Sequence, residues 1–189
     1  MTAQLKPTYA QVKNRFESLR ELALKIAHDD LRPVISNKRQ QAVLKNEIQL
    51  DTFTFNTQRE LRKWEKTGLR RVAWDWDAVQ KKYRSHLKRF ELSIWYRGRT
   101  LCAASIGRPT WGGGKLRLDY IESAPMGTAL DGLATDITIA AGAAYARAIG
   151  ETQLRIMNPV NDTVKNHYLS KQDFLFNEKA IFALWICKI

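Results

Sequence analysis

The sequence predicts an α/β fold with a sheet of mixed direction and flanking helices, preceded by a helical extension. Residues 115–122 alternate apolar and polar side chains like a half-buried strand, and Gln153–Met157 is a short apolar run of strand length. Between them, residues 132–149 are rich in small side chains and end at Gly150, a residue typical of helix C-termini. A strand, a helix and a strand in this order predict a parallel pair joined by a crossover helix.

Further strands and helices are expected on both sides of this unit. Residues 90–96 alternate cleanly, Arg97-Gly98-Arg99 has the character of a hairpin turn, and residues 100–107 return as a strand. A glycine-rich loop follows at 111–114. The remaining expected elements are strands at 70–74, 174–176 and 181–189, a helix from Asp75 or Asp77 to about Lys88, and a last helix opened by Asn161.

The first 67 residues are expected to be all helical. Apolar side chains recur at helical spacing over residues 8–29, and residues 37–50 give a second, weaker helix pattern. Thr57-Gln58-Arg59-Glu60 matches a capping box and predicts a helix that ends at Gly68. We therefore divide the chain into a helical basic extension, 1–67, and an α/β domain, 68–189. The extension lacks a Gly/Ser/Pro linker, which indicates that it packs on the domain.

Composition is that of an ordinary globular protein, with 44% hydrophobic and 26% charged residues among 189. No apolar run reaches the roughly 20 residues of a membrane-spanning helix, and the N-terminus lacks the apolar core of a signal peptide. Two scattered cysteines suit a reducing compartment. These observations predict a cytoplasmic protein without a membrane partner.

The net charge of +12 lies almost entirely in the first half of the chain. Between Arg59 and Arg99 there are 13 Lys/Arg and 5 Asp/Glu, interleaved with Trp64, Tyr83 and Trp95. Such a band suggests an acidic macromolecular partner, RNA or protein, with the aromatic rings stacking on bases. The equally weighted alternative is a solvated basic surface. The cations expected to bind nucleic acid are Arg62, Lys63, Lys66, Arg70, Arg71, Lys81, Lys82 and Arg84.

Several common sites are missing from the sequence. The three histidines are far apart and have no carboxylate or cysteine at ligand spacing, so no metal site is predicted. There is no G-x-S-x-G motif and no G-x-x-x-x-G-K-[ST] phosphate loop.

Two features remain as carriers of chemistry. Gly132 stands at a turn-to-helix junction, where free N–H groups bind pyrophosphate, although this motif taken alone favours a glycine that only lets the chain turn. Asn161 and Tyr168 are seven residues apart and therefore share a helix face. The Tyr168 hydroxyl there either donates a proton to a leaving group or simply packs at the surface.

Three local matches, with the order of elements over about residues 69–189, resemble the GCN5-related N-acetyltransferase (GNAT) family. They are YIESAP at 120–125, YARAIG at 145–150 and NPVNDTVKNHYLSKQDF at 158–174. In the last match Asn161, Val164, Tyr168 and Phe174 fill the family's pattern of Asn, aliphatic residue, Tyr and Gly-Phe, with Gln172-Asp173 in place of the glycine. The family's phosphate loop aligns with 129–134, where Ala129 replaces a leading Gln or Arg and Asp131 adds a negative charge.

This resemblance implies an acyl-CoA N-acyltransferase-like fold that holds acetyl-CoA in a splayed V between the strands at 115–122 and 153–157. It implies that Tyr168 protonates the leaving thiolate and that Glu122, or else Asp119, deprotonates the amine. The residues implied to bind the cofactor are Ile121, Ser123, Asp131, Gly132, Leu133, Ala134, Thr135 and Asn161.

We therefore predict an N-acetyltransferase that acts by direct transfer to an amine on a protein or an RNA-linked acceptor. One alternative is a catalytically inactive member of the fold that binds nucleic acid or protein through its basic half. Another is an interaction protein whose extension docks a partner or a second copy, giving a homodimer.

Overall fold

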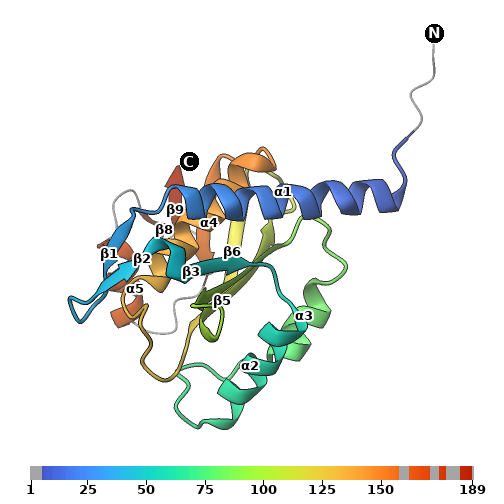
Figure 1. Ribbon diagram of the computed structural model, residues 1–189. Helices are drawn as coiled ribbons and strands as arrows, with labels where there is room; N and C mark the ends of the chain where they lie inside the picture. The colour runs from blue at the N-terminus through green and yellow to red at the C-terminus, as the bar shows by residue number, and fades with distance from the viewer. Residues whose placement is uncertain (1–5, 158–161, 171–174, 178–183, 189) are drawn as a thin grey trace.

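The computed structural model describes residues 6–157, 162–170, 175–177 and 184–188 (Figure 1). Its main sheet has seven strands in the order β3-β4-β5-β6-β7-β9-β8. All neighbouring pairs are antiparallel except β6 and β7, which run parallel as the sequence predicts. The strands are β3 (Ile48–Asp51), β4 (Phe90–Tyr96), β5 (Thr100–Pro109), β6 (Lys115–Ser123), β7 (Gln153–Met157), β8 (Leu175–Asn177) and β9 (Leu184–Lys188).

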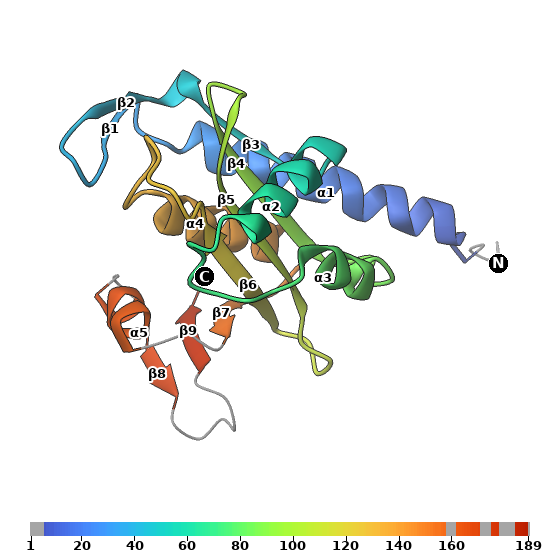
Figure 2. The same ribbon diagram turned by 90° about the horizontal axis from the view of Figure 1, so that it is seen from below.

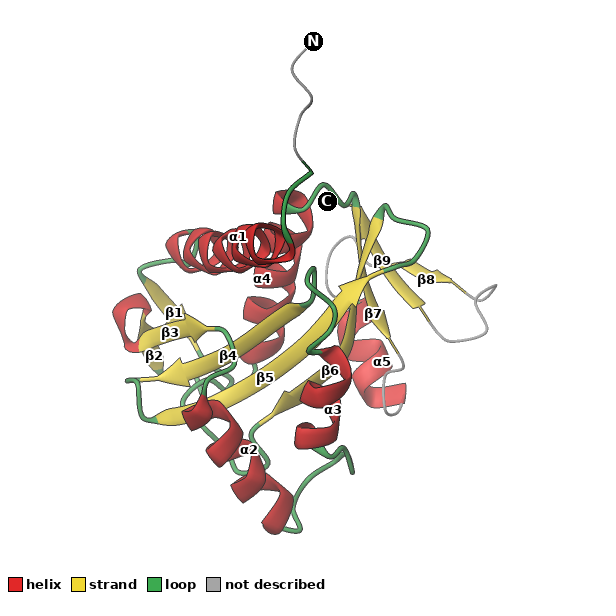
Figure 3. Cartoon of the chain, turned by 90° about the vertical axis from the view of Figure 1, so that its right-hand side faces the viewer, coloured by secondary structure: helices red, strands yellow, loops and turns green. Residues whose placement is uncertain are grey.

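Helices cover both faces of this sheet (Figure 3). Helix α1 (Tyr9–Asp29) packs on α4 (Ala134–Ala148) on one face, and α2 (Phe55–Lys66) and α3 (Trp76–Tyr83) lie on the other. Viewed from below, α2 and α3 lie in front of β4–β6 and α4 lies behind them (Figure 2). Helix α5 (Asp162–Leu169) follows β7. None of the described helices combines the length and apolar character that a bilayer crossing requires.

The face under α1 and α4 is an aliphatic core, and we call it the α4 face. Phe90, Leu92 and Ile94 of β4 are fully buried there, with Leu116 and Leu118 of β6. Gly142 lets α4 approach the sheet closely, because a Cβ at this position would lie 3.2–3.3 Å from the Leu118 and Leu154 side chains.

The face under α2 and α3 is an aromatic core, which we call the α3 face. Trp76 and Tyr83 of α3 are buried against Leu61 and Trp64 of α2 and against Trp95 of β4. Trp74 and Tyr120 extend this layer, with ring centroids 5.0 Å apart in an edge-to-face arrangement.

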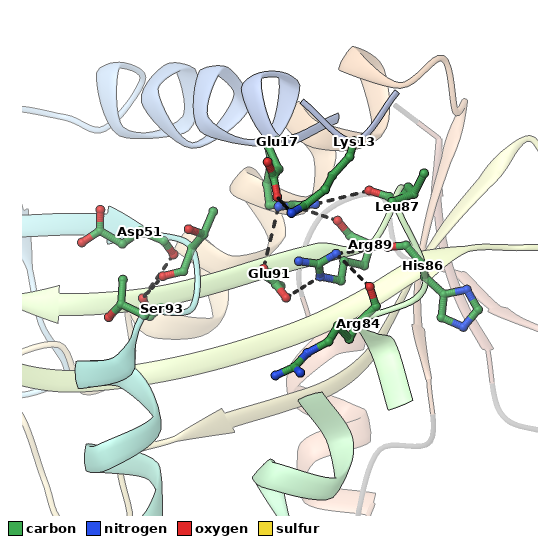
Figure 4. Close-up of polar contacts among 12 residues, drawn as sticks. Lys13, Glu17, Asp51, Arg84, His86, Leu87, Arg89, Glu91 and Ser93 are labelled. Atoms are coloured by element: carbon green, nitrogen blue, oxygen red, sulfur yellow. Dashed lines mark hydrogen bonds and ion pairs between the residues drawn. The ribbon is translucent and has the colours of Figure 1, made fainter. Parts of the chain in front are cut away.

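Helix α1 is tied to the sheet by a buried arginine. Arg20 is 2% exposed and donates to the Arg89 carbonyl oxygen at 3.0 Å, while its guanidinium lies 3.8 Å from Glu91 on β4. Figure 4 shows Glu91 below this helix and beside Arg89, whose Nε donates to it at 2.5 Å. The N-terminal helix is thus part of the main packing, as the missing linker predicted.

The expectation that residues 1–67 are all helical is wrong. The predicted helix at 37–50 is instead the hairpin β1 (Val34–Ser36) and β2 (Ala42–Leu44), a 3-10 turn at Lys45–Glu47 and strand β3. The Asn37 side chain accepts from the N–H groups of Arg39 and Gln41, and this closes a turn where a helix was expected.

Smaller corrections concern element ends. Thr54, not Thr57, caps α2, and Thr57 takes the third position of the capping box. Residues 70–74 form no strand. Helix α3 starts after Asp75, one of the two predicted caps, but ends at Tyr83 rather than near Lys88. The boundary after residue 67 stays a prediction, although β3, which precedes it, pairs with β4, which follows it.

Candidate functional site

Strands β6 and β7 part halfway along β6. Their parallel ladder runs from Lys115–Gln153 to Leu118–Ile156, whereas β6 continues to Ser123, held on its other side by β5. Among the described residues, the backbone of 119–123 therefore has no ladder partner on the β7 side. Backbone N–H and C=O groups need hydrogen-bond partners, so this fork favours the binding of an extended ligand that has amide groups of its own. Ile121 and Ser123, predicted to bind cofactor, lie on this free edge.

Glu122 faces α3 and is only 6% exposed. Arg70 donates to both of its oxygens from Nε and Nη2, each at 2.7 Å, and the Trp76 indole N–H donates to Oε2 at 2.7 Å. The carboxylate raises the pKa of Arg70 through these hydrogen bonds. Glu122 thus anchors the segment between α2 and α3 to the end of β6.

Asp119 also accepts hydrogen bonds from an aromatic side chain and an arginine. The Tyr83 hydroxyl donates to its Oδ2 at 2.6 Å, and Arg117 donates to Oδ1 from Nε at 2.9 Å. Burial, followed by the charge of Asp119, raises the pKa of Tyr83, which keeps the phenol protonated as a donor. Asp119 lies on the α3 face because its neighbour Leu118 points to the α4 face, and the shift in the β5–β6 register between Ile106 and Gly107 lets Tyr120 and Glu122 point to the α3 face as well.

Both predicted bases, Glu122 and Asp119, therefore accept hydrogen bonds from an arginine and from an aromatic side chain. Each carboxylate accepts three hydrogen bonds, and its two oxygens offer about four acceptor positions, so little capacity remains to accept a proton from an amine. The sequence pointed to Glu122 and Asp119 but not to Arg70 and Trp76, because these lie 52 and 46 residues from Glu122 in the chain.

The loop before α4 is covered by the β1–β2 hairpin. The Lys38 N–H donates to the Asp131 carbonyl oxygen at 2.8 Å, and the Asn37 amide donates to the Ala129 carbonyl oxygen at 3.0 Å. The Asp131 carboxylate accepts from the Thr128 N–H at 2.8 Å and lies 3.6 Å from Arg39. The hairpin thus brings two cations to a loop that lacks the family's leading Gln or Arg.

Gly132 has a φ of +83°. A Cβ on it would lie 3.1 Å from the Lys38 Cβ, so the glycine serves the turn and the packing of the hairpin rather than open space for a ligand. Ala134 opens α4 with Leu133 as its N-cap, and Ala134 and Leu133 pack into the core. The Leu133 and Ala134 N–H groups already donate to the Leu130 carbonyl oxygen, so an anion at this helix start would be held by the remaining N–H groups and the Thr135 hydroxyl.

Tyr168 lies on α5, the helix that follows β7, as predicted. Its side chain and the whole of Asn161 fall outside the described part of the structure, so their roles stay predictions.

Some cations of the basic band pair with carboxylates. Arg70 is buried against Glu122, Arg62 donates to Asp77 at 2.8 Å, and Lys63 donates to Glu60 at 2.8 Å. The cations Lys66, Arg71, Lys81, Lys82 and Arg84 are exposed. The expectation that Trp64 and Trp95 stack on bases is wrong, because each is only 7% exposed within the α3 face. Nucleic-acid binding thus stays a prediction that rests on the exposed cations.

No cluster of three or more metal-ligating side chains occurs among the residues described. Burial raises the pKa of the Cys102 thiol to about 11, so this cysteine is a poor nucleophile.

Comparison with solved structures agrees with this fold. The chain resembles Ard1 from Thermoplasma volcanium at 9% identity with a TM-score of 0.57, covering 76% of this chain and 99% of that one. It resembles the PaiA N-acetyltransferase of Thermoplasma acidophilum, solved with coenzyme A, at 14% identity and a TM-score of 0.52, covering 75% and 99%. The N-acetyltransferase PseH of Campylobacter jejuni gives 11% identity, a TM-score of 0.53, and coverage of 75% and 98%.

The chain has the GNAT acetyltransferase fold. No family model and no curated protein matches the sequence, so the likeness lies in the structure. The fold predicted from residues 115–174 is confirmed. The fork, the loop covered by the hairpin and the two hydrogen-bonded carboxylates all belong to this fold.

Proposed function

We propose that the protein transfers an acetyl group from acetyl-CoA directly to an amine. The observation that carries the proposal is the fork between β6 and β7, where the backbone of 119–123 has no ladder partner on the β7 side among the residues described. The neighbour PaiA, which shares the fold, was solved with coenzyme A. Bound there, acetyl-CoA supplies the thioester that an amine attacks.

The residues around the fork fit such a cofactor. Backbone groups of Ile121 and Ser123 would bind the amides of the pantetheine arm. The first N–H groups of α4 would face the phosphates, as helix N-termini favour anions. Lys38 and Arg39 add positive charge beside this loop and offset the negative charge of Asp131.

We propose that Tyr168 protonates the departing thiolate and that Glu122 takes the proton of the amine, with Asp119 second. Arg70 and Trp76 leave about one acceptor position of Glu122 open, and the carboxylate would take the proton of the amine there. The basic first half of the chain favours an acceptor carried on an acidic molecule over a polyamine.

Calorimetry with acetyl-CoA tests the proposal. We expect micromolar affinity, about −8 kcal/mol. Replacing Lys38 and Arg39 together by glutamate should weaken binding at least tenfold, because four units of negative charge are added beside the phosphates. The matched control replaces Lys81 and Lys82 on α3 by glutamate and should leave the affinity unchanged.

Wild-type protein that gives no heat at millimolar acetyl-CoA would refute the enzyme and favour the inactive alternative. Equal weakening by both charge reversals would show that the covered loop does not hold the phosphates.

A further inference from the structure

Three arginines stand side by side on adjacent strands of the sheet. Arg108 of β5 is the register partner of Arg117 of β6, and Arg117 is the register partner of Arg155 of β7. Directly opposed residues on neighbouring strands point to the same face, with Cβ atoms about 5 Å apart. Because Leu116 and Leu154 point into the α4 face, the three arginines point to the α3 face.

Little negative charge balances this row. Arg117 donates to Asp119, and Arg108 donates from Nη1 to His86 Nε2 at 2.9 Å. Burial and the charge of Arg108 lower the pKa of His86, so the imidazole is neutral near pH 7 and accepts this hydrogen bond. Asp119 is thus the one carboxylate with a hydrogen bond or ion pair to the row among the residues described.

Arg155 has no such partner in the part of the chain that the structure describes. Its Nε is buried without a hydrogen bond, and so is Oε1 of Gln153, two residues away on the same strand face. Burial, followed by the charge of Arg117, lowers the pKa of Arg155. Like charges directly opposite each other on a sheet are destabilising, and a buried donor without an acceptor costs further stability. An anion between the guanidinium groups would relieve both costs.

The geometry points to a binding site for a phosphate group formed by Arg108, Arg117 and Arg155. Three arginines and one aspartate leave a net charge of +2, which matches a phosphate dianion better than a single carboxylate. A guanidinium group binds a phosphate through two parallel N–H···O hydrogen bonds. Arginines on three neighbouring strands place several such groups close together.

The site is open at one end and lies near the fork. Arg108 lies over the ring of Trp111, which is 89% exposed, with the Arg108 Cζ 5.4 Å from the ring centroid. The Arg117–Arg155 pair directly precedes Leu118–Ile156, the last pair before the strands part. On the basis of the proposed function, the phosphate belongs to the amine-bearing acceptor and holds that acceptor beside the point of transfer.

Thermal unfolding of the full chain in sodium phosphate, against sodium chloride at equal ionic strength, tests the site. Phosphate should raise the unfolding temperature of the wild type. Arg155→Gln should lower the apparent phosphate affinity at least tenfold and should be more stable than wild type in chloride, because an unpaired buried charge is gone. Arg147→Gln, an exposed position on α4, removes the same charge on the other face and should respond like wild type.

A phosphate response that is equal in wild type and Arg155→Gln, or absent from wild type, overturns the site whatever acetyl-CoA does. Phosphate that competes with acetyl-CoA in calorimetry also overturns it, because the anion would then belong to the cofactor. A response lost only in Arg155→Gln supports the site even where acetyl-CoA gives no heat, and in that case the proposed transfer fails and the phosphate site stands.

Discussion

The two faces of the sheet are built from different chemistry. The α4 face is aliphatic, with Leu92, Ile94, Leu116 and Leu118 all at 0% exposure. The α3 face is aromatic and ionic, and there Trp76 and Tyr83 each donate to a carboxylate of β6. Aliphatic packing needs only volume and shape, whereas each buried charge needs a matched partner.

This difference indicates that the two faces of the sheet have separate roles. The α4 face stabilises the fold, whereas the carboxylates, the arginine row and the free backbone edge proposed to act at the point of transfer lie on the α3 face or at the fork. The following predictions test that division, from the largest expected effect to the smallest.

Phe90→Ala should give the largest loss of stability. Phe90 is fully buried on the α4 face, and its ring centroid lies 5.9 Å from that of Tyr145. Large-to-small core substitutions of this kind cost about 3–5 kcal/mol. Urea denaturation measures the loss, while acetyl-CoA affinity of the remaining folded protein should be unchanged. A specific loss of cofactor binding would contradict the proposal that the α4 face serves only the stability of the fold.

Glu122→Gln should destabilise the protein by about 3 kcal/mol, because it leaves the Arg70 guanidinium buried without its counter-charge. The double variant Glu122→Gln with Arg70→Met should regain part of this loss, since no unpaired charge remains. A single variant as stable as wild type would show that the pair is not coupled. If Glu122 is also the base, turnover of the variant should show a shifted pH profile.

Tyr168→Phe should lower turnover by about 10²-fold, the usual range for a general acid, with acetyl-CoA affinity nearly unchanged. Thiol release in the presence of a working acceptor measures this. Equal turnover in wild type and variant would leave Tyr168 as a packing residue.

Asp131→Asn should tighten acetyl-CoA binding by a few-fold, in line with roughly 0.2–1 kcal/mol for an exposed charge pair. The amide oxygen can still accept from the Thr128 N–H, while Arg39 is released toward the phosphates. Calorimetry of the two proteins gives the ratio, and weaker binding by the variant would contradict the expected role of the hairpin cations.

The smallest effect concerns pH. The pKa of His86 is lower in the folded protein than the ordinary value of 6.5, so the unfolded chain binds more protons in this range. Stability contributed by neutral His86 is therefore present above pH 6.5 and is lost as pH falls below it. The unfolding temperature of wild type should drop more between pH 7 and pH 5 than that of His86→Gln, and equal drops would contradict this.

Local patterns were sufficient for the central unit of the fold. Alternation placed β4 and β6, and small residues ended by Gly150 placed α4, because each pattern reflects the burial of that segment alone. The hairpin at 34–44 was missed because Val43 and Leu44 suit either a helix face or a strand, and the Asn37 side chain decides for the turn.

The site was less accessible to sequence reasoning for the same reason. Ile121, Glu122 and Asp119 were found from a local motif, but the partners Arg70, Trp76 and Tyr83 come from distant segments that the fold brings together. The row Arg108, Arg117 and Arg155 depends on strand register, which no single stretch of sequence contains.

Hydrogen exchange with and without acetyl-CoA tests the central claim most directly, because the fork predicts which amides a bound cofactor covers. We expect slower exchange for amides of 119–123 that face β7 and for the first turn of α4, with β4 unchanged. Protection elsewhere on the surface, or none at saturating acetyl-CoA, would contradict the claim that the fork is the cofactor site.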